Sequence, residues 1–217
     1  MLTQHLPNMG RRTVLGLAIA AMAAAPWRAS FADPADSAAQ GPIVRLDNAL
    51  LAAMKSGGSA SFNARYRALE PEVERVFNLN AVLAASIGLS WATVPEAQKA
   101  ELATAFRRYT VSTYVSNFNS YNGQSFEILP TVRPVGNGEV VVRTRLIRTN
   151  DSPVKLDYVM RQGPGGWQVV DVLTDGSISR VAVQRSDFQQ LLMSGGPPAL
   201  VAGLGRKVAS LSGGMLG

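Results

Sequence analysis

The residues of this chain that could carry acid–base chemistry lie close together in the sequence. Asp171 and Asp175 form a pair of neighbouring carboxylates, and Tyr158 directly follows Asp157. A carboxylate and a phenol can move protons on an apolar substrate if burial raises the pKa of the carboxyl group. Aspartates followed by glycine also shape turns and accept hydrogen bonds from backbone N–H groups. The alternatives are therefore a small isomerase or hydrolase acting through Asp171 and Tyr158, or a structural role for these residues.

The chain is poor in the residue types that serve as nucleophile–base pairs or as metal ligands. It contains no cysteine, and its one histidine, His5, lies in the segment that we predict to be removed as an export signal. Without these residue types, the common nucleophile–base pairs and histidine-bound zinc sites cannot be assembled. The glycine-rich segments 163–166 and 195–198 lack the lysine of a phosphate-binding loop. We therefore predict a protein that is not an enzyme, with no catalytic residues, no metal ion and no cofactor.

The start of the chain has the composition of an export signal. Arg11-Arg12 precedes an apolar segment over residues 14–25, and Ser30 and Ala32 are small residues at the cleavage-determining positions. The apolar segment is shorter than the about 20 residues of a membrane-spanning helix. We predict cleavage after Ala32, which makes residues 1–32 a signal peptide, and export from the cytoplasm. Both a twin-arginine and a general secretory signal are compatible with the arginine pair.

The rest of the chain has the length of one domain. We predict a flexible, alanine-rich leader over residues 33–40 and a single domain over residues 41–212. The whole chain has 21 basic and 15 acidic residues, and loss of the three arginines of the signal leaves 18 basic residues and a net charge of +3. This small excess, without interleaved aromatic residues, predicts no nucleic-acid partner.

Helical periodicity dominates the first half of the chain. The longest predicted helix follows the Thr93–Glu96 capping pattern and ends near Asn119. Near the end of the chain, Ser186 and Gln189 also have capping-box spacing, which predicts a helix that begins near Asp187. Other helices are predicted over residues 43–54, 62–69, 71–77 and 81–88, and after the prolines at 197 and 198.

Alternation of apolar and polar residues dominates the stretch between these helical regions. Glycine-, asparagine- and proline-rich loops separate four alternating segments, which predicts an antiparallel sheet with one apolar face. We therefore predict an α+β fold: a helical N-terminal half packed on one face of a curved antiparallel sheet of about four strands, with C-terminal helices. The strands are marked by Phe126, Ile128 and Val132; by Val140, Val142, Thr144 and Leu146; by Val154, Leu156, Tyr158 and Met160; and by Trp167 and Val169.

An ordered set of motifs runs through most of the chain after the signal. Its residues are Ile87-Gly88-Leu89-Ser90-Trp91, Pro95, Gln98, Phe106, Tyr109, Tyr121, Tyr158, Trp167 to Val172, Gly176 to Ser179, and Gln184 to Phe188. This set resembles the MlaC family of periplasmic lipid carriers, also called the toluene-tolerance family, and within that family it is most similar to the hopanoid-associated HpnM branch; the resemblance implies a periplasmic location. One position departs from the family pattern, because Phe77 is followed by Asn78 where the family has aspartate.

The resemblance implies a nuclear-transport-factor-like fold whose helices and curved sheet enclose an apolar pocket for lipid tails. It also implies that residues 41–212 form a lipid-carrier domain. Such a carrier would shuttle a phospholipid or a hopanoid-type lipid between membrane-bound complexes of the inner and outer membranes. Its partners would be that lipid and those complexes.

Lipid-binding residues are expected on the inward faces of the strands and on the longest helix. Each buried methylene group contributes about 0.8 kcal/mol, so a carrier needs an apolar wall of considerable area. For each residue taken singly, an ordinary place in the core is the alternative. The predicted lining is Phe106, Tyr109, Tyr114, Phe118, Val142, Leu146, Leu156, Tyr158, Met160, Trp167 and Val169.

Overall fold

The structure is a computed structural model that describes residues 34–216. The predicted signal peptide and its cleavage after Ala32 lie outside the described residues. The helices are α1 (Pro34–Ser56), α2 (Phe62–Val76), α3 (Leu79–Ile87), the 3₁₀ helix η1 (Gly88–Thr93), α4 (Glu96–Asn117) and α5 (Arg180–Ser212).

The first helix includes residues 34–40, for which the sequence predicted a flexible leader. Alanine has the highest helix propensity of all residues, and this stretch is alanine-rich. Tertiary contacts also hold it, because Ala39 is buried and the Gln40 amide donates to the carbonyls of Leu129 and Pro130 at 3.1 Å each. A leader of this composition is thus able to extend the helix that follows it.

Short polar side chains start three of the helices. Ser61 caps α2, Asn78 caps α3 and Ser179 caps α5, each accepting a hydrogen bond from a backbone N–H three residues later. Asn78 therefore keeps a capping role at the position where the sequence departs from the family pattern.

The predicted start of α5 near Asp187 is wrong by about two turns. Ser179 Oγ accepts from the Ala182 N–H at 3.0 Å, so the helix begins at Arg180, and Ser186 lies inside it. Non-helical backbone at Gly195 and Gly196 divides α5 into two helices before Pro197. The predicted break before the prolines is confirmed.

The sheet is entirely antiparallel among the described strands. Its order is β1-β4-β5-β3-β2, with β6 on the other edge of β5 and β7 beside β6. The strands are β1 (Ser125–Ile128), β2 (Arg133–Gly136), β3 (Glu139–Val142), β4 (Thr144–Ile147), β5 (Val154–Gly163), β6 (Gly166–Thr174) and β7 (Ile178–Ser179).

Two of the four predicted strands are each divided in the structure. The second becomes β3 and β4, which pair with successive parts of the same edge of β5 and are separated only by Arg143. The first becomes β1 and β2, separated by a segment with Pro130, which has no N–H for the ladder. The predicted α+β class and the antiparallel sheet with helices on one face are confirmed.

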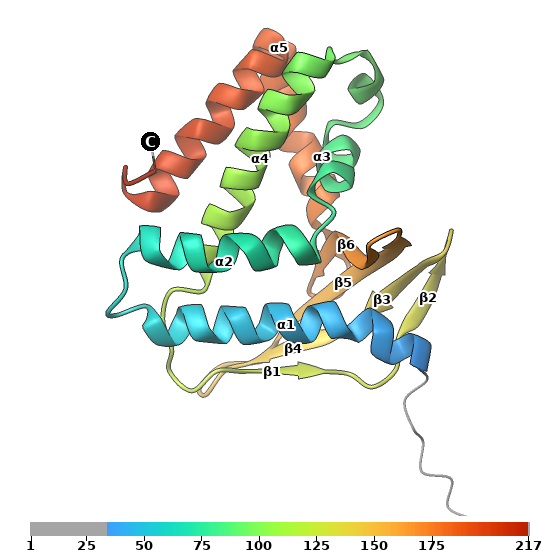
Figure 1. The fold of residues 1–217 in the computed structure, drawn as a ribbon, viewed down its shortest axis with the longest axis vertical. Coiled ribbons are helices and arrows are strands. Elements are labelled where there is room, and N and C mark those ends of the chain that lie inside the picture. Colours follow the sequence, from blue (N-terminus) through green and yellow to red (C-terminus); the bar gives the residue numbers. More distant parts are fainter. Residues whose placement is uncertain (1–33, 217) are drawn as a thin grey trace, which may run out of the picture. The chain divides into compact units, whose positions relative to one another are not determined.

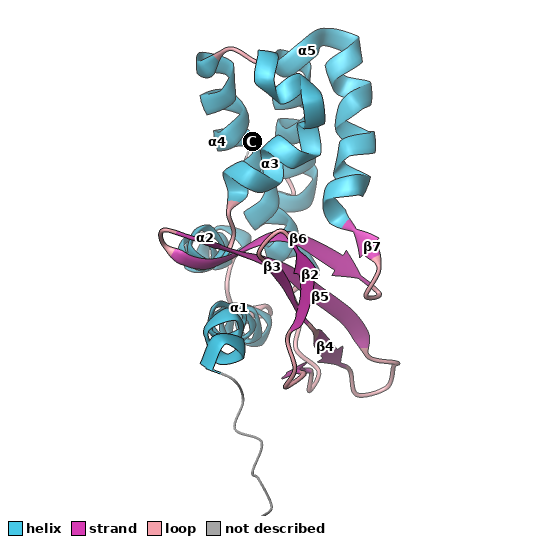
Figure 2. Cartoon of the chain, turned by 90° about the vertical axis from the view of Figure 1, so that its right-hand side faces the viewer, coloured by secondary structure: helices cyan, strands magenta, loops and turns pink. Residues whose placement is uncertain are grey.

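The helices form two groups relative to the sheet. Helices α1 and α2 lie side by side and cross the sheet, whereas α3, α4 and α5 gather beyond α2 as a helical layer (Figures 1 and 2). Two hydrophobic clusters correspond to these groups. The sheet core joins α1, α2 and the C-terminal half of α4 to the strands, and the helical core joins α3, α5 and the N-terminal half of α4.

Candidate functional site

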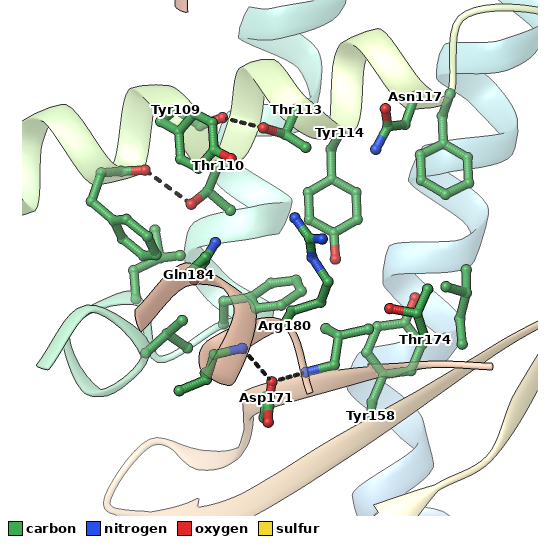
Figure 3. A pocket seen from close by; sticks show the side chains of 18 of the residues that line it. Tyr109, Thr110, Thr113, Tyr114, Asn117, Tyr158, Asp171, Thr174, Arg180 and Gln184 are labelled. Atoms are coloured by element: carbon green, nitrogen blue, oxygen red, sulfur yellow. Dashed lines mark hydrogen bonds between the residues drawn. The ribbon is translucent and has the colours of Figure 1, made fainter. Parts of the chain in front are cut away.

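A cavity of about 370 Å³ lies where the sheet core and the helical core meet. This volume falls within the range of about 300–1,000 Å³ that is typical of small-molecule sites. Helix α4 forms one wall, strands β5 and β6 form the opposite wall, and the first turns of α5 close one side (Figure 3). The lining residues are Phe77, Leu79, Val82, Phe106, Tyr109, Thr110, Thr113, Tyr114, Asn117, Phe118, Leu146, Val154, Leu156, Tyr158, Asp171, Val172, Thr174, Arg180, Val181 and Gln184.

Most of the residues predicted to bind lipid line this cavity, but not all of them. Those that line it are Phe106, Tyr109, Tyr114, Phe118, Leu146, Leu156 and Tyr158. Those that do not are Val142, Met160, Trp167 and Val169. That these residues bind lipid stays a prediction.

The residues outside the cavity pack in the sheet core instead. Val142, Met160 and Val169 are 0% exposed, and Trp167 is partly buried against the same cluster. At this end of the sheet α1 and α2 cover the strands, and the Asn78 N–H donates to the Val169 carbonyl at 2.9 Å. Alternation along a strand predicts which side chains face inward, but not which element covers them.

Several polar lining residues were missed by the sequence reasoning. On α4, Thr110, Thr113 and Asn117 continue the helical face of Phe106. Their three- and four-residue spacing from Phe106 was a usable signal, but only apolar and aromatic residues were predicted to line the pocket. Arg180 and Gln184 were missed because the start of α5 was predicted at Asp187, although Gln184 lies in the motif Gln184 to Phe188 and Ser179 is a suitable capping residue.

Asp171 has a structural role in this site. Its Oδ1 accepts hydrogen bonds from the backbone N–H groups of Val172 at 2.7 Å and Val181 at 3.0 Å, and its Oδ2 accepts from the Ser179 hydroxyl at 2.5 Å. The carboxylate thereby ties β6 to the first turn of α5. Asp175 has a positive φ of 53° and forms the turn before β7.

Tyr158 makes no hydrogen bond with either candidate aspartate. Its neighbour Asp157 points to the opposite face of β5, because successive strand residues alternate. Among residues 34–216, neither the Tyr158 hydroxyl nor the Tyr114 hydroxyl has a hydrogen-bond partner, whereas Asp171 is fully engaged with backbone and serine donors. The described residues thus present no carboxylate–phenol pair for proton transfer.

The two phenols point into the cavity from opposite walls (Figure 3). Burial raises the pKa of the Tyr114 hydroxyl and of the Tyr158 hydroxyl, so both stay protonated at neutral pH. They can donate hydrogen bonds to a polar group of a ligand but cannot act as bases.

A buried carboxylate lies close to these phenols. Asp47 of α1 is 5% exposed, and neither of its carboxylate oxygens has a hydrogen-bond partner in the described part of the chain. Desolvation by burial raises its pKa from 3.8 to about 7. Asp47 does not line the cavity, so it belongs to the surrounding core.

Residues 34–216 contain no group of three or more histidine, cysteine, aspartate or glutamate residues placed to hold a metal ion. None of their helices combines the length and the apolar character needed to span a bilayer.

An antiparallel sheet, a covering of helices and an apolar cavity with a few polar groups define an α+β protein built around an internal pocket. The family model described as MlaC protein matches residues 45–206. The chain therefore belongs to the MlaC family. The match is to the family as a whole, and the HpnM branch stays a prediction.

A solved structure has the same fold. It is a phospholipid-binding protein from Ralstonia solanacearum, determined in complex with a phospholipid. The two chains are 22% identical, with a TM-score of 0.69, and the match covers 80% of this chain and 98% of the other.

Proposed function

We propose that this protein is a periplasmic lipid carrier that holds the tails of a phospholipid or a hopanoid-type lipid in the cavity between α4 and the sheet. In this proposal it shuttles the lipid between membrane-bound complexes of the inner and outer membranes, and it catalyses no reaction. The cavity is the observation that carries the proposal.

The cavity fits hydrocarbon in its composition. Its wall is built mainly from apolar and aromatic side chains of α4, β5 and β6. Each methylene group transferred from water to such a wall gains about 0.8 kcal/mol, so a tail of ordinary length is held strongly. The walls can still release the lipid to a membrane, because a bilayer offers the tail an equally apolar environment.

Family membership and the structural neighbour support the same proposal. The Ralstonia solanacearum protein that shares the fold was solved with a phospholipid. The predicted signal peptide supports a location outside the cytoplasm, where a lipid must cross an aqueous space between two membranes. Asp171 is engaged in structural hydrogen bonds, so we do not favour the isomerase or hydrolase alternative.

The test is to express the full chain, purify the mature protein without detergent, and measure bound lipid by extraction and native mass spectrometry. We expect a bound lipid, and transfer of a labelled phospholipid between donor and acceptor vesicles. Recovery of protein without lipid, together with no transfer above the rate without protein, would refute the proposal.

A matched pair of variants assigns the lipid to the cavity. Leu156→Glu places a charge on the cavity wall and is expected to abolish lipid retention. Ile178→Glu makes the same kind of change at a side chain that is 51% exposed and outside the cavity, so lipid retention should persist. Thermal unfolding of each variant is the check that it is folded. Equal retention by the two variants would place the lipid elsewhere.

A further inference from the structure

Charge is sparse in the cavity wall. Of the side chains that line the cavity, only Asp171 and Arg180 are charged. Three donors already occupy the Asp171 carboxylate. Arg180 therefore contributes the positive charge of this site.

The Arg180 guanidinium has no counter-charge in the described part of the chain. It makes no ion pair with any of the carboxylates of residues 34–216, although several other arginines there do. It also donates no hydrogen bond to an acceptor within residues 34–216, in contrast to Arg185, which donates to the Ala85 carbonyl. Arg180 is exposed to solvent and lines the cavity as well, so it marks the mouth.

A second donor lies beside it. Figure 3 shows the Arg180 side chain reaching towards Tyr114, with Tyr158 on the wall below. Burial raises the pKa of the Tyr114 hydroxyl, and the Arg180 guanidinium acts in the opposite direction because the two groups are close. The mouth thus combines a planar cation with a protonated hydroxyl, and neither has an acceptor among the described residues.

This arrangement matches the chemistry of a phosphate group. A guanidinium presents paired N–H donors that fit two phosphate oxygens, and a phenol adds a neutral donor to a third. A ligand that is apolar throughout would leave these donors without an acceptor. A lipid phosphate lies next to the apolar tails, so it could accept hydrogen bonds from both donors at the cavity mouth.

We propose that Arg180, assisted by the Tyr114 hydroxyl, binds the phosphate of a phospholipid at the mouth of the cavity and so selects phosphate-bearing lipids over neutral lipids such as hopanoids. This inference rests on the proposed carrier function and narrows its ligand class.

The test compares two lipids that differ in the phosphate. Phosphatidic acid and diacylglycerol with the same acyl chains are titrated into delipidated mature protein, and binding is followed by tryptophan fluorescence and native mass spectrometry. Arg180→Gln is expected to weaken phosphatidic acid binding by about tenfold, with diacylglycerol binding unchanged. Tyr114→Phe keeps the ring that packs on Phe118 and is expected to cause a smaller loss of the same kind.

Arg206→Gln is the matched control. Arg206 is an exposed arginine in the second part of α5, beyond the break at Gly195 and Gly196; it makes no ion pair with the described residues and does not line the cavity. Its substitution is expected to leave the binding of both lipids unchanged. An equal loss of phosphatidic acid binding in Arg180→Gln and Arg206→Gln would mean that only the net surface charge matters, and it would overturn the inference.

Other outcomes separate this inference from the function on which it rests. Wild-type protein that binds neither lipid contradicts the carrier function itself. Binding of both lipids with no effect of Arg180→Gln contradicts only the phosphate contact. If inorganic phosphate alone binds the wild type but not Arg180→Gln, and diacylglycerol and phosphatidic acid bind equally, the site takes free phosphate and the headgroup assignment is wrong.

Discussion

The two ends of the helix-covered sheet face carry the same kind of side chains, but one end is packed solid and the other borders a cavity. At one end Val142, Met160 and Val169 are packed completely beneath α1 and α2. At the other end Leu156 and Tyr158 face a cavity across from α4. Leu156, Tyr158 and Met160 occupy every second position of strand β5, so their side chains share one face. The strand itself therefore does not decide which end is closed. The covering helices decide it: where α2 ends and the chain turns into α3, the face stays open.

The largest expected effect tests the closed end. Met160→Ala should lower the free energy of unfolding by about 2–5 kcal/mol, because it leaves a void among fully buried neighbours. Leu156→Ala at the open end should cost clearly less, since its side chain already borders empty space. Denaturant unfolding of the two variants in lipid-free protein measures both. An equal loss of unfolding free energy in the two variants would mean that the two ends are packed alike, which contradicts the contrast between a closed and an open end.

A pH-dependent effect should arise at Asp47, beside the two phenols. Burial raises its folded-state pKa from 3.8 to about 7. A raised acid pKa destabilises the fold as pH increases: the penalty is absent below about pH 4, grows towards pH 7 and is complete above it. At about 1.4 kcal/mol per pH unit, the penalty reaches up to about 4 kcal/mol.

Asp47→Asn should remove this pH dependence. The stability of the wild type relative to the variant is then expected to fall between pH 4 and pH 8, as measured by urea unfolding at each pH. The comparison between pH values cancels the constant cost of burying an amide. A difference that stays flat over this range would show that the Asp47 carboxyl is ionised at low cost.

The smallest expected effect compares two tyrosine hydroxyls. Tyr158→Phe removes a hydroxyl that has no hydrogen-bond partner within residues 34–216, so it should change the free energy of unfolding by less than about 1 kcal/mol. Tyr66→Phe in the sheet core removes a hydrogen bond to Glu70 of 3.1 Å, so it should lower stability by about 0.5–1.5 kcal/mol. Thermal and urea unfolding compare the two. A larger loss at Tyr158 than at Tyr66 would contradict the open-end description.

The same contrast explains how much of the molecule could be predicted from the sequence. Periodicity identified the strands and the long helix α4, because burial imposes period 2 or 3.6 on apolar residues. It could not show that α1 and α2 cover Met160 while Leu156 stays open, since this depends on contacts between segments far apart in the sequence. Arg180 was missed for a local reason: the capping pattern at Ser186 competed with the actual cap at Ser179.

The most direct test of the central claim is to fill the cavity and measure bound lipid. Thr113 lines the cavity from α4, so Thr113→Trp should occupy the space that a tail would take. Thr104→Trp is the control, because Thr104 lies on the exposed side of the same helix and makes the same hydrogen bond to the carbonyl four residues earlier. In native mass spectrometry of the purified mature proteins, we predict lipid on the wild type and on Thr104→Trp and none on Thr113→Trp. Undiminished lipid on a folded Thr113→Trp protein would contradict the claim that the cavity is the lipid site.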